Sequence, residues 1–137
     1  MDSFGMFKVS ASALEAQRKR MNVIASNMAN VHSTRTEEGG PYKKRDVVFA
    51  AMTVESSPET MFGVKVDDVV TDNTPPKMVY DPSHPDANKD GYVAVPDINI
   101  VEEMTNMMMA FRAYEASVSA FNMSKSMVEK ALEIGKS

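Results

Sequence analysis

The residues best suited to chemistry lie in one short segment from Asp86 to Asp97, with the sequence DANKDGYVAVPD. Side-chain oxygens stand at its first, third and fifth positions, a glycine at the sixth and a carboxylate at the twelfth, as in a helix–loop–helix calcium loop. Pro82 and Pro85 occupy the place of the incoming helix, which proline disfavours. We therefore predict an Asp/Asn/Gly turn that leads into a strand. A calcium-binding regulatory module built on this loop stays as an alternative.

Catalytic chemistry has little else to build on. The chain contains no cysteine, which excludes thiolate nucleophiles, disulfides and cysteine-based metal sites. Its two histidines, His32 and His84, are far apart in the sequence. The sequence also has no glycine-rich phosphate loop and no serine-nucleophile elbow. We predict that the protein is not an enzyme and that it has no cofactor and no metal site.

Composition narrows the choice of partners. The length of 137 residues suits one domain, or one small domain with helical extensions. The formal net charge of −4 gives no electrostatic reason to expect nucleic acid or an anionic membrane surface. No apolar run approaches the roughly 18 residues of a membrane span, so direct membrane insertion is not predicted. Residues 1–9 hold one lysine and no sustained apolar stretch, so we expect no cleaved signal peptide.

Proline divides the chain into three parts. All seven prolines lie between Pro41 and Pro96, and a proline costs a helix interior about 3 kcal/mol. We therefore predict an α+β protein with an N-terminal helix and its exit loop in residues 1–36, a small β-rich domain in 37–96 and a C-terminal helix in 97–137. The stretches expected to form strands are 46–49, 64–66, 77–80 and 92–95.

The C-terminal segment carries the clearest periodicity. Its apolar residues recur at alternating spacings of four and three, the a/d pattern of a heptad repeat, and only Lys125 interrupts them. Asn99, with Glu102 three residues later, predicts the N-cap of this helix. The N-terminal segment repeats the pattern less regularly. The residues of the predicted assembly interface are Phe7, Leu14, Met21, Ile24, Met28, Ile100, Met104, Met107, Phe111, Tyr114, Val118, Phe121, Val128 and Leu132.

These narrow apolar stripes leave the pairing of the helices open. They can pack as a hairpin within one chain, as in a monomeric helical adaptor, or as coiled coils between chains. The thirteen methionines favour interfaces that adapt to several neighbours, because the methionine side chain is flexible.

Three stretches of the chain together resemble the flagellar basal-body rod protein family. They are residues 10–30, which end in the asparagine-rich SNMAN, residues 39–49, and residues 80–134, which begin with YDPSHPDANKDGYVA. The resemblance implies a structural subunit of the proximal rod that transmits torque from the motor to the hook. It implies terminal helices packed as coiled coils inside the rod, with further copies and other rod proteins as partners. Finally, it implies export by the flagellar type III apparatus into a rod that crosses the periplasm.

Overall fold

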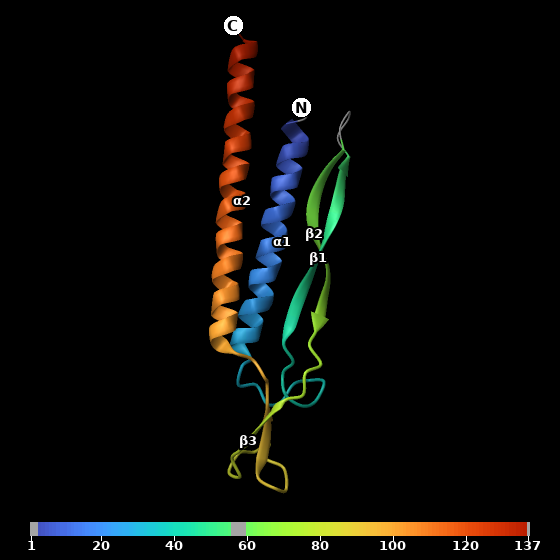
Figure 1. Cartoon of the computed structure of the whole chain (residues 1–137), viewed down its shortest axis with the longest axis vertical. Coiled ribbons are helices and arrows are strands. Elements are labelled where there is room, and N and C mark those ends of the chain that lie inside the picture. Colours follow the sequence, from blue (N-terminus) through green and yellow to red (C-terminus); the bar gives the residue numbers. More distant parts are fainter. Residues whose placement is uncertain (1–2, 56–59, 137) are drawn as a thin grey trace.

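The computed structural model describes residues 3–55 and 60–136 as one elongated molecule (Figure 1). Two long helices enclose the β-rich middle in sequence, so the predicted α+β class is confirmed. The elements in chain order are α1 (Ser3–Ala29), β1 (Arg45–Glu55), β2 (Thr60–Thr71), β3 (Lys77–Tyr80), β4 (Tyr92–Val95) and α2 (Ile100–Gly135).

The two helices lie side by side and antiparallel within the chain (Figure 1). Near the N-terminus of α1, the ring centroid of Phe7 lies 5.2 Å from that of Phe121. At the other end of the pair, the side chains of Asn27 and Glu103 form a hydrogen bond of 3.2 Å. The last turns of α2 extend past the start of α1 (Figure 1). Of the two arrangements that the sequence leaves open, the isolated chain thus adopts the hairpin.

The N-terminus of α2 is capped as predicted. The side chain of Asn99 accepts hydrogen bonds from the backbone N–H groups of Val101, at 3.0 Å, and Glu102, at 3.2 Å. Glu102 and Glu103 stand in the first turn, where negative charge favours the positive end of the helix dipole. Pro96 shortly before the cap keeps the preceding chain from joining the helix.

Strands β1 and β2 form an antiparallel hairpin that packs along α1, on the side opposite α2 (Figure 1). Both strands are longer than the predicted 46–49 and 64–66. The extra residues include Ala51 and Gly63, whose intrinsic strand preference is weak, so the sequence pattern underestimates these strands. Packing against α1 compensates for that weakness.

Gly63 shows how closely β2 approaches α1. A Cβ atom at this position would lie only 2.6 Å from Ser12 Oγ, so glycine allows the contact. The backbone N–H of Val64 donates to the same Ser12 hydroxyl at 3.1 Å, and the hydroxyl donates to the Val9 carbonyl at 2.6 Å. The small residues of α1 therefore face a strand, which the sequence pattern does not reveal.

Strands β3 and β4 have the bounds that the sequence predicts, and they pair as a second antiparallel ribbon at the end of the molecule away from both termini (Figure 1). The predicted turn before β4 is also confirmed. Gly91 has φ +84°, and a Cβ atom there would lie 2.9 Å from the Tyr80 ring. The Asn88 carboxamide oxygen accepts from the N–H groups of Asp90 and Tyr92 at 3.0 and 2.9 Å. These bonds close the turn.

The middle of the chain is thus made of two separate two-stranded sheets in the described residues. Its most buried large residues are Val54, on the hairpin beside α1, and Val93, on the ribbon. Because the hairpin packs on α1, its apolar residues share a core with that helix. The division that makes residues 37–96 a separate small domain stays a prediction.

Candidate assembly interface

None of the predicted interface residues on α1 is exposed to solvent in the monomer. Ile24 is buried, and the other four are half-buried. Phe7 packs on Phe121, so at least this residue meets α2 as the heptad pattern suggests. These residues are therefore already occupied in the isolated chain. The remaining members are Leu14, Met21 and Met28.

The predicted residues on α2 divide into two groups. The first group is half-buried in the monomer and consists of Met107, Tyr114, Val118, Phe121 and Val128. The second group is exposed to solvent and consists of Ile100, Met104, Phe111 and Leu132. We refer to the exposed group as the free edge of α2. Phe111 is 51% exposed and Leu132 is 61% exposed. About half of the predicted stripe is thus packed within the chain, and the other half remains exposed to solvent.

This division arises because α1 sits slightly to one side of the predicted stripe. Glu103 and Ala110 alternate with Met107, Tyr114 and Phe121 along the side of α2 that faces α1. Both are nearly inaccessible to solvent. Sequence reasoning missed them because one is charged and the other is small. Ala110 lies seven residues after Glu103. A small residue at this spacing lets two helices approach closely, and this was the signal that the sequence offered.

A second group of apolar residues lies on another exposed side of α2. It consists of Met109, Met123 and Met127, which are all more than half exposed, with the exposed Ala116 and Ala120 between them. A helix that is apolar on several sides is normally buried among neighbours. Contiguous exposed apolar surface also marks interaction sites. Together with the free edge, this surface makes α2 the best candidate for contacts with other chains.

A buried polar cluster fixes the relation of α1 to α2. Asn27 is fully buried and uses its whole carboxamide. Its amide group donates to the carbonyl of Arg45 at 2.8 Å and to Glu103 Oε2 at 3.2 Å. Its oxygen accepts from the Tyr42 hydroxyl at 2.8 Å and from the N–H of Arg45 at 3.0 Å. One side chain thereby joins the end of α1, the start of β1 and the start of α2.

Lys44 completes this cluster. Its ammonium lies 3.0 Å from Glu103 Oε1 and 3.6 Å from Glu102 Oε1. Burial alone lowers the pKa of Lys44, but its contact with the Glu103 carboxylate and the charges of Glu103, Asp46 and Glu102 outweigh burial and raise the pKa above its usual value. The buried Glu103 therefore has a charged partner. A buried charge without one would destabilise the fold by several kcal/mol, on the order of 3–5.

The loop considered as a calcium site makes polar contacts with the segment that follows α1. The Asp86 carboxylate accepts from the Thr34 hydroxyl at 2.8 Å and pairs with the Arg35 guanidinium. The Thr34 hydrogen bond, followed by the hydrogen bond and charge of Arg35, lowers the pKa of Asp86 below its usual value. Among the residues that the structure describes, no group of three or more His, Asp or Glu side chains is arranged so that it could hold a metal ion. The calcium alternative therefore gains no support.

Neither of the two helices, over the described residues, has the length and apolarity to cross a membrane.

Comparisons with known proteins agree with the resemblance seen in the sequence. The family model for the flagella basal body rod protein matches residues 7–35, and that for the C-terminal part of the flagellar basal body rod FlgEFG proteins matches residues 89–134. These two segments cover most of α1 and nearly all of α2. The middle hairpin lies outside both matches.

Curated relatives match nearly the full chain. The flagellar basal-body rod protein FlgC of Salmonella typhimurium is 42% identical, over 99% of this chain and 100% of the relative. FlgC of Bacillus subtilis is 40% identical over 99% and 100%, and FlgC of Borreliella burgdorferi is 40% identical over 98% of each. The chain therefore belongs to the flagellar basal-body rod protein family, a family of structural proteins and not of enzymes. Within that family it is FlgC-like, which makes it a component of the basal-body rod and supports assembly with other rod proteins.

Proposed function

We propose that the protein is a structural subunit of the proximal part of the flagellar rod and that it assembles through the exposed sides of α2. The observation that carries this proposal is the free edge of α2, where large apolar residues stay exposed although the helix is already packed on α1. Further copies of this chain and other rod proteins are its partners. In the rod, helices of neighbouring subunits would cover this edge as coiled coils.

Transmission of torque from motor to hook requires contacts that do not slip. A long row of side chains packed into the spaces of a neighbouring helix resists sliding better than a small patch, because every turn must be displaced at once. α2 has 36 residues, and at about 1.5 Å per residue it offers such a row over roughly 54 Å. The methionines at its surface adapt to neighbours that are not identical.

We further propose that the chain is exported by the flagellar type III apparatus and works in a rod that crosses the periplasm. Support comes from family membership and from the absence of cysteine in the sequence. A chain without cysteine cannot form disulfides, so it can pass through a narrow channel unfolded and fold afterwards in any redox environment.

The test uses Phe111, the large aromatic residue of the free edge. We expect Phe111→Asp to block incorporation into the rod, because a carboxylate buried in an apolar helix contact is strongly unfavourable. The variant is expressed in cells that lack the native protein, and motility and rod formation by electron microscopy are scored.

Glu115→Gln is the matched control, since Glu115 is exposed on the same helix near Phe111. It should preserve motility. Far-ultraviolet circular dichroism of purified Phe111→Asp should match that of the native protein, because Phe111 is half exposed in the monomer. A motile Phe111→Asp strain would contradict the proposed interface.

A further inference from the structure

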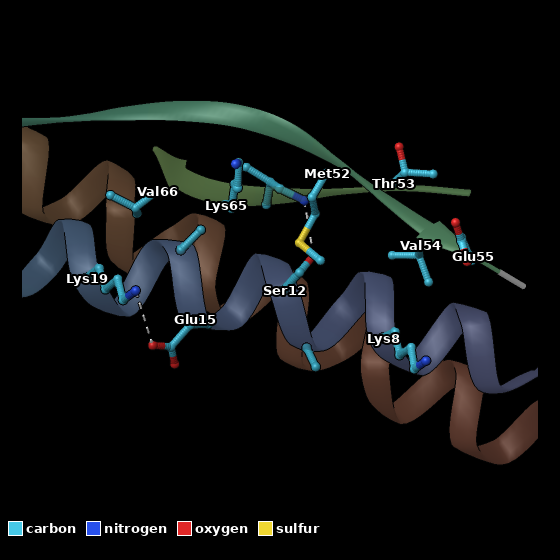
Figure 2. A pocket seen from close by; sticks show the side chains of 13 residues that line it. Lys8, Ser12, Glu15, Lys19, Met52, Thr53, Val54, Glu55, Lys65 and Val66 are labelled. Atoms are coloured by element: carbon cyan, nitrogen blue, oxygen red, sulfur yellow. Dashed lines mark hydrogen bonds and ion pairs between the residues drawn. The ribbon is translucent and has the colours of Figure 1, made fainter. Parts of the chain in front are cut away.

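A groove runs between α1 and the β1–β2 hairpin, on a side of α1 that α2 does not cover (Figure 2). α1 contributes residues from Lys8 to Lys19, and the strands contribute residues 52–55 and 64–66. The groove has a volume of about 850 Å³. Nothing in the described part of the chain fills it.

The groove has the size and chemistry to hold a short amphipathic helix. From Lys8 to Lys19 it follows three turns of α1, or about 17 Å. Its apolar lining includes Met52, Val64 and Val66, whereas lysines stand around it on both α1 and β2. The lining has three lysines, Lys8, Lys19 and Lys65, against the two acidic residues Glu15 and Glu55. Lys19 lies 3.9 Å from Glu15, and Lys65 lies 3.5 Å from Asp67, which is outside the lining, so Lys8 supplies the excess positive charge. A helix with an apolar face and an acidic flank is the complementary ligand.

The end of α2 is such a helix. Residues 126–135 form the last turns of α2, which extends past the start of α1 (Figure 1), and these ten residues span about 15 Å. Met127 and Leu132 are more than half exposed there, about 140° apart around the helix axis, and the exposed Ala131 lies between them on this broad side. Glu129 and Glu133, four residues apart, share the adjoining side of the helix. Lys130 pairs with Glu133 at 2.9 Å, so two acidic residues stand against one lysine in residues 126–135.

We propose that residues 126–135 of one copy dock into the groove between α1 and the β1–β2 hairpin of a second copy. The end of α2 cannot reach the groove of its own chain, because α2 and the hairpin lie on opposite sides of α1 (Figure 1). The two contacting surfaces are different, so each copy both gives an end and receives one. Such a contact propagates from subunit to subunit, unlike a two-fold contact that closes a dimer. The proposal rests on the proposed function in naming which surfaces of two rod subunits meet.

Disulfide crosslinking tests this contact directly, because the native chain has no cysteine. Ala11→Cys places a thiol at the groove, and Ala131→Cys places one on the end of α2; both alanines are exposed. The two full-length variants are mixed, concentrated and oxidised. We expect a mixed disulfide dimer of the Ala11→Cys and Ala131→Cys chains to form several-fold more than either homodimer.

Ala25→Cys is the matched control, since Ala25 is also exposed on α1 but lies outside the groove. Mixed with Ala131→Cys, it should give no excess of mixed dimer. A dominant Ala131→Cys homodimer, or equal mixed dimer with Ala11→Cys and Ala25→Cys, would overturn the proposal. So would crosslinking of Ala131→Cys only to another purified rod protein, because the occupant would then not be a second copy.

A charge exchange gives an independent measurement. Lys65→Glu and Glu129→Lys should each reduce the mixed dimer several-fold, and the two changes together should restore it if these side chains approach each other. Motility of the same strains is scored separately. Motile strains that lack the crosslink would overturn the groove contact and leave the rod function standing. If the Ala25→Cys control keeps its fold but loses motility, α1 contributes to the rod outside the groove. That result would count against the proposed function, which assigns assembly to the exposed sides of α2.

Discussion

The two long helices carry apolar residues at similar spacing, but the fold uses them differently. α1 is enclosed between α2 and the β1–β2 hairpin, and its buried residues are Gly5, Ala16, Ile24 and Asn27. α2 is nine residues longer, and its buried residues are Glu103 and Ala110. Most of its large apolar side chains remain exposed.

This difference assigns the helices separate tasks. α1 holds the monomer together, because it is the element that both α2 and the hairpin contact. α2 packs on α1 with one side only, and its other sides stay exposed, where neighbouring subunits can bind. A substitution in α1 should therefore act on the stability of the single chain, whereas an equivalent substitution on the exposed sides of α2 should act on assembly.

The largest effect is expected at Asn27. Asn27→Ala removes four hydrogen bonds and takes one partner away from the Arg45 backbone and from buried Glu103, which keeps the Lys44 ammonium. We expect it to lower the free energy of unfolding by about 3 kcal/mol or more. Urea unfolding followed by circular dichroism measures the change. Asn22→Ala, an exposed asparagine on the same helix, is the control and should stay within about 0.5 kcal/mol of the native protein. Equal losses at the two positions would contradict the role of the cluster.

The next largest effect is expected for one of two phenylalanines of α2, whose contributions to monomer stability should differ. Phe121 is half-buried against Phe7, and Phe111 lies on the free edge. We expect Phe121→Ala to destabilise the monomer by about 2 kcal/mol, below the 3–5 kcal/mol of a fully buried phenylalanine. Phe111→Ala should change monomer stability by less than about 0.5 kcal/mol. The same unfolding measurement compares them at a concentration where the protein is monomeric. A larger loss for Phe111→Ala would mean that the free edge belongs to the monomer core.

A smaller effect is expected where β2 meets α1. Gly63→Ala brings a methyl group against Ser12 Oγ, so we expect a loss of about 1–2 kcal/mol in unfolding free energy. Gly135→Ala is the control, because a Cβ atom there meets nothing within 4 Å and alanine favours the helix. Thermal unfolding of the two variants should move the melting temperature in opposite directions or leave the control unchanged. An unchanged Gly63→Ala would show that the hairpin can move away from α1 without cost.

The smallest effect is expected in how the stability of the fold depends on pH. Because the pKa of Asp86 is lowered in the folded protein, its contacts stabilise the fold above the unfolded pKa. That contribution disappears as the pH falls through the lower folded pKa. Asp86→Asn should therefore weaken the protein near neutral pH and make its stability less dependent on pH below about 4. Unfolding at about pH 6 and about pH 3 measures this. Asp90→Asn, in the same loop, should keep the native dependence because the Thr34 and Arg35 contacts remain.

Much of the fold follows from local sequence. Proline-free ends with heptad spacing produce the two helices, the Asn99 cap starts α2, and strands β3 and β4 appear at their predicted residues. The turn before β4 is determined by Asn88 and Gly91 within a few residues. These features depend on backbone conformations and hydrogen bonds between near neighbours, so the sequence alone determines them. Membership of the rod family is visible at the same level.

Only the tertiary structure decides which side of each helix is used. Both α1 and α2 have several sides on which small or apolar residues could pack, and periodicity cannot choose between them. The choice depends on contacts between distant residues: Asn27 with Glu103, and Ser12 with the backbone beside Gly63. The first rotates α2 so that half of its heptad stripe faces α1 and half faces solvent. The second brings the hairpin onto α1 and creates the groove. Both depend on polar or small side chains, which contribute little to a hydrophobic pattern and become decisive only when folding places them together.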